Sequence, residues 1–219
     1  MKLELLIGNK NYSSWSLRPW LALRHGGLEF EETRVPLYTP GSPALIRAWS
    51  PAGKVPVLRH GAIAVWDSLA ICEYLAESFP EKKLWPRERE ARARARAIAA
   101  EMHSGFGALR AQMPMNVRAT GRRVARTPEL EADIARVAQL WRECLEQRSA
   151  RGPFLFGEFS IADAMYAPVA FRFATYGVAL GRTEQAYAEA LRALPAMRAW
   201  AEAAAGETEV IAGAELGTG

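Results

Sequence analysis

Apolar and polar positions alternate along the first part of the chain in a way that predicts short strands and helices in turn. Runs of adjacent or alternating apolar residues predict strands, and apolar residues three or four apart predict helices. The predicted strands cover residues 3–7, 30–37, 55–58 and 62–66. The predicted helices cover residues 15–25, 42–49 and 68–79. This β-α-β-α-β-β-α order predicts a compact α/β unit in which an antiparallel hairpin joins an otherwise parallel sheet.

The pattern changes near residue 87, where strand signals nearly vanish and Ala, Arg, Glu and Leu dominate. Ser160 and Asp163 form a Ser-x-x-Asp capping box that opens a helix. This helix is apolar on all sides, which predicts the centre of a helical domain. The other helices predicted from apolar stripes cover residues 91–113, 130–145, 183–193 and 195–205.

With 219 residues, the chain has room for one large domain or two modest ones. The change of pattern favours two. We predict a first domain over residues 1–80, a linker at 81–86 and an all-helical second domain over 87–219. Residues 206–219 carry weak signals and are expected to form a loosely packed tail.

Composition and charge are those of an ordinary globular protein. Half of the residues are hydrophobic, 24% are charged, and the net charge is +4 with a pI of about 9.3. Much of the positive charge comes from arginines within 87–96. These arginines share no helical stripe and no aromatic residues lie between them, so a solvated face is favoured over a nucleic-acid interface.

The sequence gives no indication of a membrane span, a secretory leader or a metal site. No run approaches the roughly 18 apolar residues of a membrane span, and the N-terminus lacks a secretory apolar region. Cys72 and Cys144 have no metal-type spacing and lie in apolar helical patterns, so we expect buried free thiols. We expect a cytoplasmic protein with no metal and with no membrane or nucleic-acid partner.

A serine-rich turn lies between the first predicted strand and the first predicted helix. Ser13 and Ser14 can cap that helix, whose unpaired amides and positive dipole end favour an anion. A hydroxyl at this place can donate to such an anion. The alternative is that the serines only cap the helix. The element order is thioredoxin-like, and in such folds a Cys-x-x-Cys motif opens this helix. Hydroxyls here replace the thiols, so they can stabilise a thiolate that a ligand brings.

Val55 and Pro56 stand at the start of the third predicted strand. The position after Gly53 and Lys54 suggests a cis peptide bond between Val55 and Pro56. The turn would expose the backbone N–H and C=O of Val55, which can pair with an extended peptide like an added strand. The alternative is an ordinary proline on an edge strand.

Asp67 and Ser68 begin the third predicted helix. The Ser68 hydroxyl and the amides behind it would bind a carboxylate, and Asp67 would accept from an ammonium group. The alternative is an N-cap and nothing more. Together with the serine turn and the Val55 backbone, the pair would complete a site for a thiol tripeptide with a free α-amino acid end.

At this point the sequence resembles the glutathione transferase family over nearly its whole length. The resemblance is carried by the motifs at 12–18, 54–56, 67–75, 160–163, Pro168 and 194–200. It implies a thioredoxin-like domain that binds glutathione as co-substrate, followed by the helical domain of that family. The serine motif is most similar to the zeta class, where Ser-Ser-Cys-Ser is the pattern; Trp15 stands in place of the cysteine.

The resemblance also implies roles for particular residues. Ser13 would stabilise the glutathione thiolate, with Ser14 as its close rival. Val55, preceding Pro56, would hold the cysteinyl backbone, and Asp67 and Ser68 the γ-glutamyl end. Lys54 would reach a carboxylate of the ligand or would be a solvated lysine. The acceptor pocket would be lined by Trp15, Phe106, Met113 and Phe171, although core packing explains these side chains as well.

The implied function is a transferase in which a serine hydroxyl activates glutathione for attack on a small hydrophobic electrophile, as in detoxification. One alternative is a glutathione-dependent cis–trans isomerase of the maleylacetoacetate type. Another is a binding protein with low turnover. A homodimer is expected by resemblance.

Overall fold

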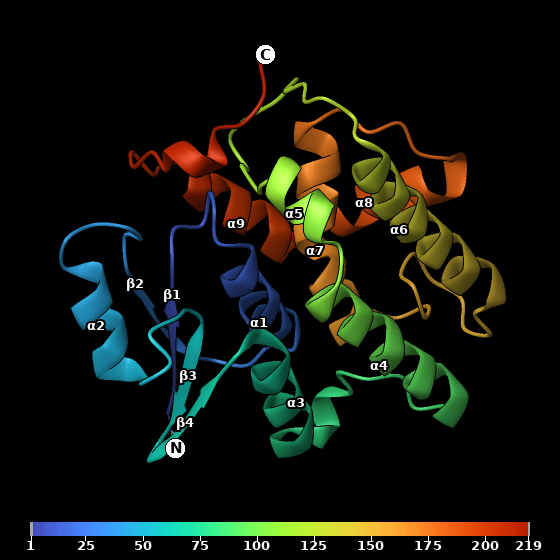
Figure 1. Ribbon diagram of the computed structural model, residues 1–219. Coiled ribbons are helices and arrows are strands. Elements are labelled where there is room, and N and C mark those ends of the chain that lie inside the picture. The colour runs from blue at the N-terminus through green and yellow to red at the C-terminus, as the bar shows by residue number, and fades with distance from the viewer. Residues whose placement is uncertain (1, 219) are drawn as a thin grey trace.

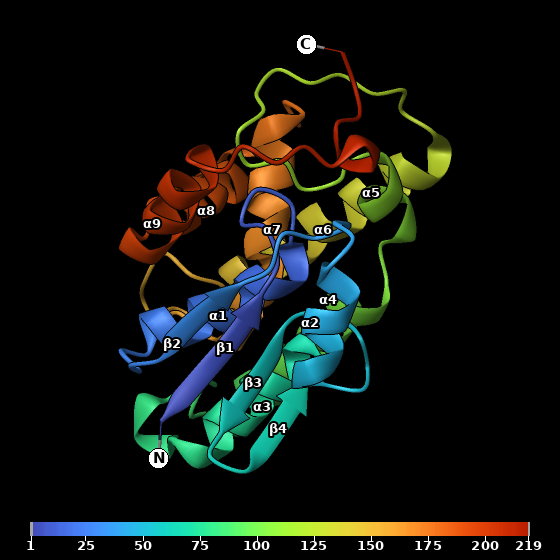
Figure 2. The same ribbon diagram turned by 90° about the vertical axis from the view of Figure 1, so that its left-hand side faces the viewer.

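The computed structural model describes residues 2–218, and its first part is a four-stranded sheet with three helices (Figure 1). The strands are β1 (Leu3–Ile7), β2 (Glu31–Arg34), β3 (Val57–His60) and β4 (Ile63–Trp66). The helices are α1 (Ser14–His25), α2 (Ser42–Trp49) and α3 (Ser68–Ser78). The strand order is β2-β1-β3-β4; β1 and β2 are parallel and the β3–β4 hairpin joins antiparallel, as predicted (Figure 2).

Alternating side chains of β1 bury the two faces of the sheet against different helices. Leu5 and Ile7 belong to the large core shared with α1 and α3, whereas Leu6 packs in a small cluster with Ile46 of α2. This period of two is what a sheet covered on both faces requires. The sheet therefore fixes where α1 begins, and so where the serine turn lies.

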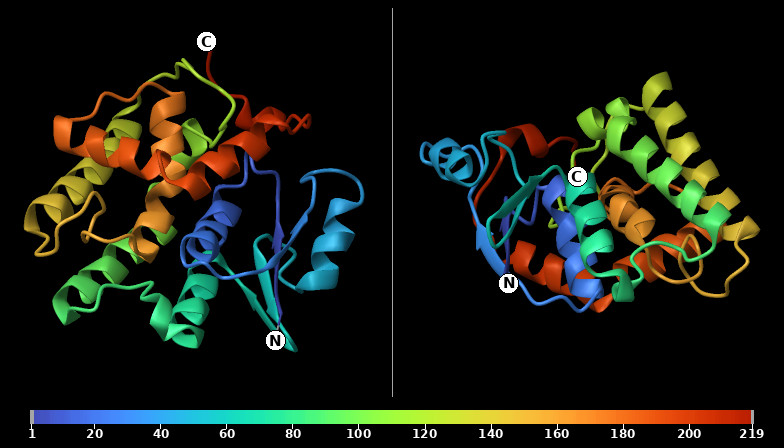
Figure 3. Two further views of the ribbon diagram at one scale, coloured as in Figure 1. Left: turned by 180° about the vertical axis from the view of Figure 1, so that it is seen from behind. Right: turned by 90° about the horizontal axis from the view of Figure 1, so that it is seen from below.

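The second part of the chain is helical. Its helices are η1 (Pro80–Lys82), α4 (Arg89–Ser104), α5 (Gly107–Gln112), α6 (Pro128–Gln147), α7 (Ile161–Thr175), α8 (Arg182–Arg192), α9 (Pro195–Ala205) and η2 (Ala212–Ala214). All residues of α7 except Ala174 are buried, which confirms the predicted central helix. Helix α1 lies between the sheet and α7, so the two domains share one continuous core (Figure 3).

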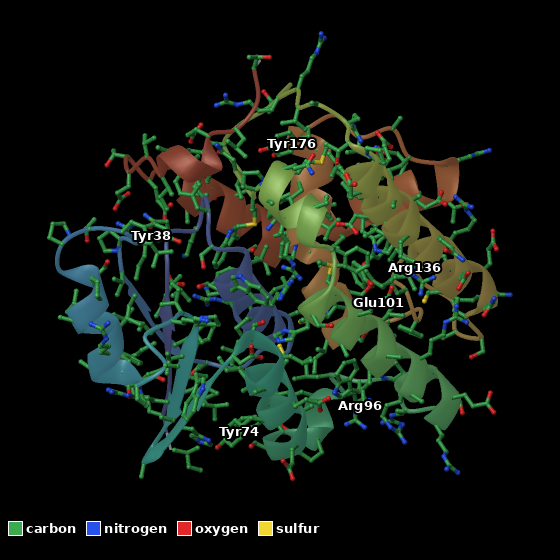
Figure 4. The ribbon with its side chains drawn as sticks, viewed as in Figure 1. Tyr38, Tyr74, Arg96, Glu101, Arg136 and Tyr176 are labelled. Atoms are coloured by element: carbon green, nitrogen blue, oxygen red, sulfur yellow. The ribbon has the colours of Figure 1, made fainter. Side chains whose placement is uncertain are left out.

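The single helix predicted over 91–113 is wrong, because the chain breaks between α4 and α5. Phe106 has a positive φ of 60°, and the Arg110 guanidinium turns back to the carbonyl oxygens of Met102, His103 and Gly105. The apolar stripe continues through the break, so periodicity alone could not reveal it. Helix α4 is tied to α6 instead, where Arg136 donates two hydrogen bonds of 2.7 and 3.0 Å to the carboxylate of Glu101 (Figure 4).

Two predicted strands are shorter or displaced in the structure. The strand predicted at 55–58 begins only at Val57, since Pro56 has no N–H to donate to a neighbouring strand. The strand predicted at 30–37 is reduced to Glu31–Arg34, and Pro36 follows shortly after it. Cys72 and Cys144 are buried free thiols, as predicted. Within residues 2–218, no helix is both long and apolar enough to cross a membrane.

Residues 206–218 are mostly exposed, as expected of a loosely packed tail, but polar contacts tie this segment to the loop after β1. The carboxylate of Glu207 accepts hydrogen bonds from the backbone N–H groups of Lys10 (2.7 Å) and Asn11 (3.0 Å). The Tyr12 hydroxyl donates to Glu215 at 2.6 Å, and Arg118 donates to that hydroxyl at 2.9 Å. These are polar contacts between residues far apart in sequence, which apolar periodicity does not report.

Replacing Glu207 by alanine should lower the free energy of unfolding by about 1–3 kcal/mol, because it leaves two amides of the β1–α1 loop without an acceptor. Urea unfolding of the variant and of Glu202→Ala, an exposed glutamate on α9, measures the difference. Equal midpoints for the two variants would show that the tail does not hold the loop.

Candidate functional site

The serine turn closes the end of β1 and caps α1. Ser13 is the N-cap residue; its hydroxyl oxygen accepts from the Ser16 N–H at 3.3 Å, and its hydroxyl donates to the Ser16 oxygen at 2.7 Å. Ser16 in turn accepts from the N–H of Gly8 at 3.1 Å. The hydroxyl of Ser13 is thus occupied within the turn.

Ser14 is the first residue of α1 and its hydroxyl has a different environment. Its oxygen accepts a hydrogen bond of 3.2 Å from the Nη2 of Arg172, which lies on α7 in the second domain. Among the described residues, none accepts a hydrogen bond from the hydroxyl proton of Ser14. This proton is therefore free to point toward a group bound just beyond the N-terminus of α1, where the helix dipole favours an anion.

Three arginines surround Ser14 and Trp15, and we call them the arginine cluster: Arg18 on α1, Arg110 on α5 and Arg172 on α7. The guanidinium carbons of Arg18 and Arg110 lie 4.3 and 4.7 Å from the centre of the Trp15 ring. Within residues 2–218, none of the three is within 4.0 Å of a carboxylate oxygen.

Burial makes this arrangement costly for the charged groups. Loss of solvent, followed by repulsion from neighbouring guanidinium groups, lowers the pKa of Arg18 and of Arg172 to about 9. Both groups still carry their charge at neutral pH. The Nε atom of Arg18 is buried without a hydrogen-bond partner. Positive charge that lacks a nearby counter-charge favours the binding of an anion at this place.

The Val55–Pro56 peptide bond is cis, as predicted. Pro56 is buried, Val55 is half-buried and Lys54 is exposed on the turn before it. The pairing of the Val55 backbone with a ligand, and the contact of Lys54 with a ligand carboxylate, stay predictions.

Asp67 and Ser68 begin α3, and Asp67 is held in a strained backbone conformation with a φ of 77°. One carboxylate oxygen accepts from the N–H groups of Leu69 and Ala70 at 2.9 and 3.3 Å. The other lies 3.2 Å from Nε2 of His103 on α4. The Ser68 hydroxyl accepts from Arg18 at 3.4 Å, which links this helix start to the arginine cluster.

If Asp67 holds the ammonium end of glutathione, as the resemblance implies, Asp67→Asn should raise the KM for glutathione about tenfold or more, with a smaller change in kcat. Asparagine caps a helix as well as aspartate does, so the variant removes the charge that an ammonium group needs and keeps the cap. Steady-state kinetics at varied glutathione concentration measures the effect. An unchanged KM would exclude Asp67 from the head-group site.

The residues predicted to line an acceptor pocket have unequal positions. Trp15 is half-buried, and its ring meets His103 edge-on at 5.4 Å. Phe106, Met113 and Phe171 are each no more than 8% exposed and belong to the large core. Their contact with a substrate stays a prediction, and core packing accounts for their burial.

Sequence reasoning missed Arg172, Arg110 and His103. Arg172 carries one usable signal, because it is the one charged residue of helix α7 beyond the first turn, where Asp163 caps the helix. Such a residue is rarely buried without a partner. Arg110 and His103 lie among many charged residues and have no comparable signal. In the described part of the chain, no group of three or more His, Cys, Asp or Glu residues is arranged to hold a metal ion.

Comparison with known proteins agrees with this architecture. The family model for the N-terminal domain of glutathione S-transferase matches residues 12–78, and the model for the C-terminal domain matches residues 125–203. A glutathione transferase homologue from Burkholderia gl BGR1, solved with bound glutathione, is 23% identical with a TM-score of 0.73. The match covers 94% of this chain and 100% of that chain. It shows a shared fold.

Two curated relatives match shorter segments. Glutathione S-transferase 1 of Dianthus caryophyllus is 39% identical over 94 residues, which are 42% of this chain and 41% of the relative. A probable maleylacetoacetate isomerase of Caenorhabditis elegans is 36% identical over 93 residues, 42% of each protein. The matched segments thus span about two fifths of the length of these relatives.

Proposed function

The chain belongs to the glutathione S-transferase family, and we propose that it is an enzyme that activates the thiol of glutathione for attack on a small electrophile. One observation carries this proposal. The Ser14 hydroxyl at the N-terminus of α1 donates no hydrogen bond within the described residues, and it lies beside buried arginines that lack a carboxylate partner. A thiolate is the anion that this arrangement would stabilise. The thiolate, rather than the thiol, is the nucleophile.

We assign the sulfur contact to the Ser13–Ser14 pair, and the hydrogen bonds favour Ser14. Ser13 already donates to Ser16, whereas Ser14 only accepts, from Arg172. The Ser14 hydroxyl would donate to the sulfur, and the N-terminus of α1 would add its dipole. Val55 would pair with the cysteinyl backbone, while Asp67 and Ser68 would hold the γ-glutamyl end.

Titration with glutathione tests the proposal directly. Binding should be accompanied by the ultraviolet absorbance of a thiolate at a pH where free glutathione is a thiol. With 1-chloro-2,4-dinitrobenzene as the electrophile, a sulfur–carbon bond should form, chloride should leave and the thiol proton should pass to solvent. If glutathione does not bind, the chain shares the family fold without this chemistry.

A second candidate function is the cis–trans isomerisation of an unsaturated acid. The sulfur would add to the double bond, the resulting single bond would rotate, and the sulfur would leave again. The arginine cluster favours this candidate over a purely hydrophobic acceptor, because its charges suit a carboxylate. One matched relative is a probable maleylacetoacetate isomerase. The test is to incubate the protein and glutathione with a cis-enoic acid or with its methyl ester. If the arginine cluster binds the substrate carboxylate, only the acid should be isomerised.

A binding protein with low turnover is the remaining alternative. It would show the thiolate absorbance on glutathione binding but no product with either class of electrophile. We further propose a homodimer in the cytoplasm. The two free, buried cysteines support a reducing compartment. Light scattering should give twice the 24.2 kDa of one chain.

A surface hollow of about 900 Å³ between α3, η1 and α4 is a candidate for the dimer contact. Tyr74 and Arg96 line it and lie on the same side of the molecule (Figure 4). Arg96 is paired with Glu73 at 3.2 Å. Reversing this charge with Arg96→Glu would weaken a dimer formed through this face. A dimer formed through another face would be unaffected.

A further inference from the structure

We propose that Arg172, in the second domain, is a positioning residue that sets the acidity of the bound glutathione thiol by orienting Ser14 and by holding a positive charge beside that hydroxyl. Activation of the thiol would then require both domains. This inference rests on the proposed function, because it concerns the thiol that the serine turn would bind.

The geometry restricts the direction of the Ser14 hydroxyl. A guanidinium group only donates hydrogen bonds, so the 3.2 Å contact makes the Ser14 oxygen an acceptor and turns its proton away from Arg172. Arg172 is itself held in place by the carbonyl oxygens of Met113 and Arg110 at the end of α5. The side chain is 5% exposed and has little freedom to move. Ser14 is thereby oriented by a rigid group 158 residues away in sequence.

The charges around Arg172 strengthen its effect. Arg110 on α5 and Arg18 on α1 are the positive neighbours, and Tyr176 is the neighbour whose ionised form would oppose them. Asp67 acts on Arg18 and Asp133 acts on Arg110, so these two carboxylates offset only part of the charge of the three guanidinium groups. A net positive charge therefore remains beside the Ser14 hydroxyl. Positive charge within a few ångströms favours the ionised form of a thiol and lowers its pKa by about 1–3 units.

A purely structural role for Arg172 is the alternative. Arginine can serve only to satisfy the carbonyl groups that end α5, since these groups lack helical partners. Replacement would then reduce stability but would leave the pKa of the bound thiol unchanged. The pKa of the bound thiol therefore separates the two roles.

The experiment is a pH titration of the thiolate absorbance of glutathione bound to the wild type and three variants. Arg172→Gln keeps hydrogen-bond donors for the carbonyl groups and for Ser14 but removes the charge. It should raise the pKa of the bound thiol by about one unit or more. Arg172→Lys restores the charge and should keep the pKa within about half a unit of wild type. Arg198→Gln changes an exposed arginine of α9 and should leave the titration unaltered.

Two outcomes would overturn the inference. One is that the bound thiol of Arg172→Gln has the same pKa as in the wild type. The other is that the pKa of the bound thiol rises equally in Arg172→Gln and Arg172→Lys. If Arg172→Gln does not fold, Ser14→Ala tests the hydroxyl through which Arg172 would act, without altering the arginine. The proposal requires that variant to raise the pKa of the bound thiol, and a wild-type titration would overturn it. Absence of glutathione binding by the wild type would instead contradict the proposed function.

Discussion

Ser14→Ala is expected to lower kcat by about 10²–10³-fold while the KM for glutathione changes by no more than a few fold. Removing one well-aimed donor to a developing or resident anion has this effect in other enzymes. The head-group contacts proposed for Asp67 and Ser68 lie at the start of α3 and would remain, so ground-state binding should persist. Initial rates with 1-chloro-2,4-dinitrobenzene over a range of glutathione concentrations give both constants.

Ser13→Ala is the matched control, because it removes the neighbouring hydroxyl from the same turn. The Ser13 oxygen caps α1 through the Ser16 N–H, so this variant should lose about 1 kcal/mol of stability. Its kcat should fall much less than that of Ser14→Ala. The reverse order, with turnover lost in Ser13→Ala and kept in Ser14→Ala, would assign the sulfur contact to Ser13.

Asp163→Ala should lower the free energy of unfolding by about 3–5 kcal/mol, since it removes the acceptor of four hydrogen bonds in a fully buried place. The carboxylate accepts from the N–H groups of Leu155 (3.1 Å) and Ser160 (2.8 Å). It also accepts from the hydroxyls of Ser160 and Tyr187, both at 3.1 Å. Urea unfolding measures the loss, with the exposed Glu189→Ala on α8 as control. A loss below about 1 kcal/mol would mean that the start of α7 does not depend on the capping box formed by Ser160 and Asp163.

The same carboxyl predicts a dependence of stability on pH. Burial raises the pKa of Asp163 to about 6, although the hydrogen bonds from Leu155, Ser160 and Tyr187 oppose the shift. The folded chain therefore binds this proton more tightly than the unfolded chain, whose aspartates titrate near about 4. The contribution of Asp163 to stability is largest below that value and declines as pH rises toward 6. The difference in the free energy of unfolding between wild type and Asp163→Asn should therefore become smaller as the pH rises from about 4 to about 6. A difference that does not change with pH would contradict the raised pKa.

Much of the fold could be predicted from local pattern. The order of strands and helices, the two halves of different character and the buried α7 follow from the spacing of apolar residues, which records which faces each element must bury. Helix starts at Ser13, Asp67 and Ser160 could be placed because capping uses residues within one turn of each other. The cis bond before Pro56 could be suggested for the same local reason, although its use by a ligand could not.

What only the tertiary structure decided is which polar groups meet. Arg172 reaches Ser14, Glu207 reaches the amides after β1, and His103 reaches Asp67 across separations that no periodicity encodes. Each of these contacts depends on how two elements pack, and a polar side chain has the same sequence signature whether it meets water or a buried partner. Apolar spacing determined the architecture, since burial of apolar surface is summed over a whole helix or sheet face. The choice between neighbouring serines depends on single hydrogen bonds, and the one from Arg172 to Ser14 exists only once the two domains are packed together.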